Sequence, residues 1–77
     1  DRNTVVAHLS LDHNERALEL LATMPKDAIT EYLKAIACSR LGCKAEGRKH
    51  FLEACRLDER MEYRGNLDPE IAELLKR

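Results

Sequence analysis

The stretch from Tyr32 to Asp58 constrains the fold of this chain most strongly, because it holds two helical patterns separated by a single glycine. In and just before its first half, apolar residues recur three and four positions apart, the spacing of one face of an α-helix. These residues are Ile29, Tyr32, Leu33, Ile36, Ala37 and Leu41. Gly42 follows, and a glycine just past a helix end can take the left-handed conformation that closes the last turn. A second apolar pattern runs from Gly47 to Leu57, and such a short connection predicts two antiparallel neighbouring helices.

The rest of the chain also reads as helical. Residues 1–24 contain two short amphipathic patterns around the turn signal Asp12-His13-Asn14, and Asn14 is placed to cap the second of them. Pro25 ends that pattern because proline cannot continue the helical hydrogen bonds, and Asp27 is placed to cap the helix that follows. Residues 58–66 are polar and end in glycine and asparagine, so they predict a loop. Residues 68–77 begin with Asp-Pro-Glu, a typical helix start, and carry an apolar stripe.

The spacing within residues 27–57 resembles the tetratricopeptide repeat, a helix-turn-helix unit of about 34 residues. Small residues and one aromatic occupy the positions that the family reserves for them: Ala35, Gly47, Phe51 and Ala54. Four other positions depart from the family pattern: Glu31, Lys34, Cys38 and Glu59 stand where tryptophan, leucine, an aromatic residue and proline are expected. The match is therefore stronger in spacing than in identity.

A second, degenerate copy of the same unit precedes this one. Leu11-Asp12 lies 30 positions before Leu41-Gly42, and Ala17 and Leu21 lie 30 positions before Gly47 and Phe51. The resemblance implies an all-α fold of about five helices, with two antiparallel hairpins (1–24 and 27–57) stacked as a short right-handed superhelix. Residues 68–77 would form a capping helix, which repeat arrays need for solubility. We expect a single domain over 1–77, cut from a longer protein, because the chain begins at Asp1 beside a helical pattern.

Composition narrows the class of partner. The net charge of −1 gives no strong field toward nucleic acid or membranes, and no apolar run is long enough to span a bilayer. A basic cluster surrounds the turn after residue 40, but acidic residues interrupt it and no aromatic residues are interleaved for base stacking. The cluster consists of Arg40, Lys44, Arg48 and Lys49. A solvated edge explains it better than a nucleic-acid surface.

The cysteines and histidines give no chemical site. Three cysteines make an odd number for a disulfide framework, which mildly favours a reducing, cytoplasmic compartment, although exported proteins with free thiols exist. Cys38 and Cys55 lie on apolar faces and are expected to pack as small hydrophobes, whereas Cys43 lies in the turn. Cys38 and Cys43 straddle a helix end, and His50 and Cys55 fall on different helix faces, so we expect no zinc, no cofactor and no catalytic thiol.

The expected function is that of a non-enzymatic interaction or assembly module. In the tetratricopeptide family the first helices of the hairpins line a concave groove that binds a protein or peptide. By that resemblance the groove would be lined by Arg2, Val6, Leu9, Tyr32, Ile36, Ser39 and Arg40. Tyr32 and Ile36 could instead pack against the preceding helix as core. The alternative function is a structural spacer, or a segment that associates with a second copy through its exposed repeat ends; a monomeric solution mass would weaken self-association. A small metal- or thiol-dependent enzyme is a third class, which stoichiometric zinc in the purified protein would support.

Overall fold

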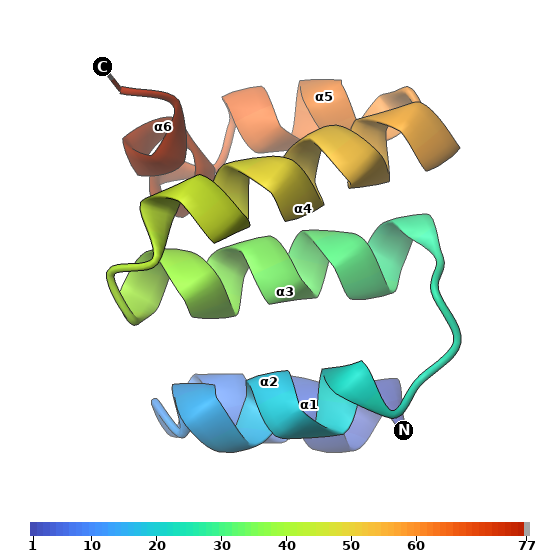
Figure 1. The fold of residues 1–77 in the computed structure, drawn as a ribbon, viewed down its shortest axis with the longest axis vertical. Helices are drawn as coiled ribbons and strands as arrows, with labels where there is room; N and C mark the ends of the chain where they lie inside the picture. The colour runs from blue at the N-terminus through green and yellow to red at the C-terminus, as the bar shows by residue number, and fades with distance from the viewer. Residues whose placement is uncertain (77) are drawn as a thin grey trace.

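The computed structural model describes residues 1–76 and contains six helices joined by short connections (Figure 1). They are α1 (Arg2–Ser10), α2 (Asn14–Ala22), α3 (Ala28–Arg40), α4 (Lys44–Leu57), α5 (Arg60–Asn66) and α6 (Pro69–Leu75). No strand occurs within this described part, so the fold is all-α as expected. None of its helices is long and apolar enough to cross a membrane, again within residues 1–76.

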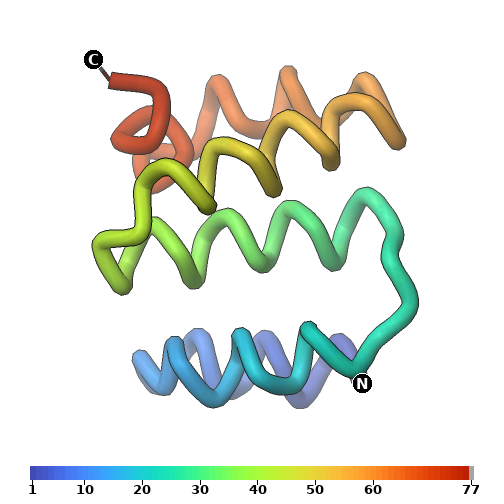
Figure 2. Tube along the Cα trace, viewed as in Figure 1, coloured from blue at the N-terminus to red at the C-terminus, as the bar shows by residue number. Residues whose placement is uncertain are grey.

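The helix α3 lies at the centre of the molecule. α1 and α2 lie together on one side of α3, whereas α4, α5 and α6 lie on the other (Figure 1). α3 packs most extensively against α4 and also contacts α2 and α6. The connection from α2 to α3 is longer than the turns within each helix pair (Figure 2).

Two turns, one in each half of the chain, have the same construction. The N–H groups of His13 and Cys43 donate to the carbonyls five residues earlier, at 2.8 and 2.9 Å. The residue before each donor has a positive φ, +62° at Asp12 and +81° at Gly42. Glycine adopts this conformation freely and aspartate tolerates it, which explains the residue types at the two positions. The two turns lie 30 positions apart, the same offset that the sequence suggests for a repeat.

Capping groups fix where the later helices begin. Asp27 Oδ1 accepts from the Thr30 N–H at 2.8 Å, and the Asp27 N–H donates to Thr30 Oγ1 at 2.9 Å, so the predicted cap of α3 is confirmed as a reciprocal capping box. Asp68 caps α6 ahead of Pro69, also as predicted. The expected cap at Asn14 is wrong, because α2 begins at Asn14 itself and His13 occupies the N-cap position.

The core consists of two clusters that meet at α3. One joins α3 to α4, α5 and α6 through Tyr32, Ala35, Phe51, Ala54, Met61, Ile71 and Leu74. The other joins α3 to α1 and α2 through Val5, Leu9, Ala17, Leu21, Leu33 and Ala37. α3 therefore buries side chains in both directions, and Tyr32 packs toward α6 rather than toward the preceding helix pair.

Residues 58–66 differ from the sequence prediction, and this raises the helix count from the expected five to six. Instead of a loop, residues 60–66 form α5. Met61 and Gly65, one helical turn apart, are buried against α4. Gly65 lies so close to the Phe51 ring that a β-carbon there would overlap the ring. The glycine that resembled a loop signal is a close contact between helices.

Candidate functional site

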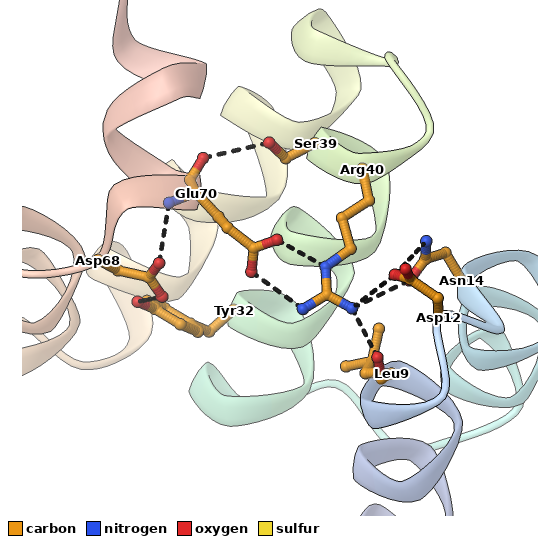
Figure 3. A network of polar contacts seen from close by, with 8 residues as sticks. All are labelled: Leu9, Asp12, Asn14, Tyr32, Ser39, Arg40, Asp68 and Glu70. Carbon is orange, nitrogen blue, oxygen red and sulfur yellow. Dashed lines mark hydrogen bonds and ion pairs between the residues drawn. The ribbon is translucent and has the colours of Figure 1, made fainter.

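Three of the residues expected to line a groove share one face of α3, and all three bind α6 (Figure 3). The Tyr32 hydroxyl donates to Asp68 Oδ2 at 2.9 Å. Ser39 Oγ donates to the main-chain carbonyl of Glu70 at 3.1 Å. Arg40 donates through Nε to Glu70 Oε1 at 2.6 Å and through Nη2 to Oε2 at 3.2 Å. This face of α3 is therefore covered by the first turn of α6.

The helix that covers this face is held by both polar and apolar contacts. The Asp68 carboxylate accepts from the Glu70 N–H at 3.0 Å through Oδ1 and from Tyr32 through Oδ2, so one side chain caps α6 and binds it to α3. Ile71 and Leu74 are fully buried in the cluster that contains Tyr32. α6 is consequently part of the core rather than a loosely attached end.

Arg40 also reaches the turn between α1 and α2. Its Nη1 donates to the Leu9 carbonyl at 2.6 Å and to Asn14 Oδ1 at 3.2 Å, and it lies 3.5 Å from Asp12 Oδ1 (Figure 3). The hydrogen bond to Glu70 raises the pKa of Arg40 above its already high ordinary value. One guanidinium thus connects the first helix pair, α3 and α6.

Tyr32 is the most deeply enclosed of the expected groove residues, with 1% of its surface exposed. Its ring meets Phe51 edge-on with centroids 6.2 Å apart, and the Arg64 guanidinium lies over the ring, 4.9 Å from its centre. Burial, followed by the hydrogen bond to Asp68, raises the pKa of Tyr32. The hydroxyl therefore remains protonated and acts as a hydrogen-bond donor within the fold.

The remaining expected residues have different surroundings. On α1, Val6 is 48% exposed and Arg2 is exposed with a 3.6 Å ion pair to Asp27, whereas Leu9 is buried in the cluster that joins α1 and α2 to α3. Ile36 on α3 is half-buried against the cluster that contains Tyr32. Of the seven residues, Arg2 and Val6 are the ones whose side chains stay largely open to solvent.

A cluster of charged side chains around the buried Glu31 was not anticipated from the sequence. Glu31 is 4% exposed, its Oε2 lies 2.9 Å from Lys34 Nζ and its Oε1 lies 3.2 Å from His50 Nδ1. Burial favours the neutral acid, but the hydrogen bonds and charges of Lys34 and His50 outweigh it and lower the pKa of Glu31. The sequence signal was present as a glutamate and a lysine one turn apart, at two positions where the repeat family has apolar residues.

Next to this cluster, a pocket of about 300 Å³ lies between α2, α3 and α4. Its lining comprises Leu18, Ala22, Lys34, Cys38, Cys43, Glu46 and His50. Cys43 is exposed, Cys38 is buried, and Cys55, which is not among the lining residues, is half-buried. Burial raises the pKa of both the Cys38 and the Cys55 thiols. Within residues 1–76, no three histidine, cysteine or acidic side chains are grouped so that they could hold a metal ion.

Comparisons with protein-family models, with curated proteins and with solved structures found no match for this chain.

Proposed function

We propose that this chain is a non-enzymatic protein-interaction or assembly module of the tetratricopeptide type, which binds a protein or peptide partner through its first helices. The repeat is supported by the two turns of identical construction, in which Asp12 and Gly42 have positive φ and the hydrogen bonds from His13 and Cys43 match. In the tetratricopeptide family, the first helices of successive hairpins line the groove that binds a partner.

The observation that carries the proposed binding surface is the exposure of Val6. On α1, Val5 and Leu9 are buried, whereas Val6 leaves 48% of its surface in water. Arg2 lies one helical turn before it with its guanidinium exposed. We name Arg2 and Val6 the α1 strip. Its counterpart on α3 is occupied by α6, so the α1 strip is the part of the expected groove that a partner can reach.

The chemistry of the α1 strip limits the partner. Val6 offers an apolar contact, and Arg2 offers a cation whose present pair with Asp27 is long, at 3.6 Å, and exposed. Exposed pairs of this kind contribute about 0–1 kcal/mol, so exchanging Asp27 for a carboxylate of the partner costs little. A segment with an apolar side chain next to an acidic one fits this surface.

The test is an affinity pull-down with the chain immobilised as wild type, Val6→Asp and Leu52→Asp. Leu52 is the matched control, because it is 60% exposed on α4, away from α1. A protein retained by wild type and by Leu52→Asp but lost from Val6→Asp supports the proposal. Retention of the same proteins by all three chains, or of none by the wild type, contradicts it. Circular dichroism of each chain checks that the variants remain folded.

The exposure of Val6 and of Leu11, which is 66% exposed, also favours a second candidate. Both are exposed apolar residues of the first helix pair, and another hairpin or a second copy of the chain could cover them. In that case the chain is a spacer or self-association segment of a larger repeat protein. Sedimentation equilibrium separates the two: a dimer in the wild type that becomes a monomer with Val6→Asp favours self-association.

A further inference from the structure

Cys38 and Cys43 lie on either side of the turn between α3 and α4 and border the same pocket. The main-chain N–H of Cys43 donates to the main-chain carbonyl of Cys38 at 2.9 Å. With standard bond lengths, this hydrogen bond keeps the two Cα atoms within about 7 Å of each other. Disulfides join Cα atoms that lie roughly 4.4 to 6.8 Å apart, so the backbone already holds this pair close to bonding range.

The two thiols differ in accessibility, and the accessibility of each suits a different step of thiol–disulfide exchange. Cys43 is exposed in the turn, where a small disulfide can reach it. Cys38 is 3% exposed in the last turn of α3 and is protected from direct attack.

We propose that Cys38 and Cys43 form a dithiol site that reacts with small-molecule disulfides and closes into an internal disulfide. The Cys43 thiolate attacks the small disulfide, forms a mixed disulfide and releases one small thiol. The Cys38 thiol then loses its proton and attacks the Cys43 sulfur of the mixed disulfide, which releases the second small thiol. Two protein thiols are oxidised, one small disulfide is reduced to two thiols, and the reaction balances.

Formation of the Cys38–Cys43 disulfide would also change the surface around the pocket. The bond would tie the end of α3 to the start of α4 across Gly42 and remove both sulfhydryl groups from the pocket that Lys34 and His50 also border. Cys55 lies near the end of α4, outside that lining, and takes no part in the proposed reaction.

The experiment uses the full chain with Cys55→Ser, which leaves only this pair, and oxidised glutathione as the probe. Intact-mass spectrometry follows the reaction, and peptide mapping locates the bond. The expected product is lighter than the reduced chain by two hydrogen atoms and carries no glutathione. Because the folded backbone holds the thiols together, we expect it to close at least about tenfold faster in buffer than in denaturing urea. Cys38→Ser in the same background should stop at a glutathione adduct on Cys43.

Three outcomes would overturn the proposal. A lasting glutathione adduct on Cys43 in the Cys55→Ser chain would show that Cys38 does not resolve it. Equal closing rates in buffer and in urea would show that the fold does not position the pair. No reaction at Cys43 would show that the exposed thiol is not a target. Circular dichroism before oxidation confirms that the variant chains are folded, so that a failure to close is not a failure to fold.

Discussion

Arg40 and Glu70, 30 residues apart in sequence, form a two-point ion pair in which the guanidinium Nε and Nη2 face the two carboxylate oxygens at 2.6 and 3.2 Å. The third nitrogen of the same guanidinium binds the turn between α1 and α2. A residue that the sequence places on a binding groove therefore serves to hold the ends of the fold together. The surface that we propose for a partner is therefore the α1 strip, Arg2 and Val6.

Replacing Arg40 should destabilise the fold although its side chain lies near the surface. Arg40→Gln removes the pair with Glu70 and the hydrogen bond to the Leu9 carbonyl, and we expect a loss of about 1–3 kcal/mol in the free energy of unfolding. Urea denaturation followed by circular dichroism measures it. Arg48→Gln, an exposed arginine on α4, is the matched control and should change little. Equal unfolding midpoints for the two variants would show that the Arg40 bridge contributes nothing.

Tyr32 should resist ionisation until the fold opens. Its pKa is raised above the ordinary value of 10.0 by burial and by Asp68, so the folded state favours the neutral phenol. The resulting stabilisation is fully present below pH 10 and is lost as pH rises toward the folded pKa. In a Tyr63→Phe chain, Tyr32 is the only tyrosine. Tyrosinate absorbance should then appear only together with loss of the helical signal, whereas the same chain in urea should titrate near pH 10. Ionisation with full helicity near pH 10 would contradict the buried hydrogen bond.

Glu31 should stabilise the fold in its ionised form. Its pKa is lowered in the folded state, so its contribution is present above the unfolded value of about 4.5 and is lost as pH falls through the folded pKa. Glu31→Gln should therefore lower the free energy of unfolding by about 1–3 kcal/mol at pH 7, and the difference from wild type should shrink below about pH 4.5. Urea titrations at several pH values measure it. Glu62→Gln, at an exposed glutamate on α5, is the matched control for replacing a glutamate by glutamine. A constant difference between Glu31→Gln and wild type at all pH values would exclude the charge as the cause.

The sequence predicted the turns and several helix starts well, because these features depend on residues that are close together in the chain. The positive φ of Gly42, the capping box of Asp27 and the Asp-Pro start of α6 each depend on residues within one or two turns. The helix at residues 60–66 was missed because Gly65 and Asn66 look like a loop locally. Its stability depends on packing against Phe51, which lies on another helix.

The candidate site was harder to predict for the same reason. Periodicity places Tyr32, Ser39 and Arg40 on one face of α3, but it does not say what covers that face. Their partners, Asp68 and Glu70, lie 30 to 36 residues away in sequence, and these contacts depend on how α6 docks. The Glu31–Lys34–His50 cluster likewise needs the α3–α4 packing, which brings His50 to a glutamate 19 positions earlier.

The interaction proposal is tested most directly by site-specific photo-crosslinking in cells that produce the chain. A photoreactive phenylalanine analogue is placed at position 6 in one chain and at position 52 in another, since Val6 and Leu52 are both exposed apolar residues on different helices. We predict a discrete protein adduct at position 6 that is absent at position 52 and is weakened by Arg2→Glu. The same adducts from both positions, or none at position 6, would contradict the assignment of the α1 strip as the binding surface.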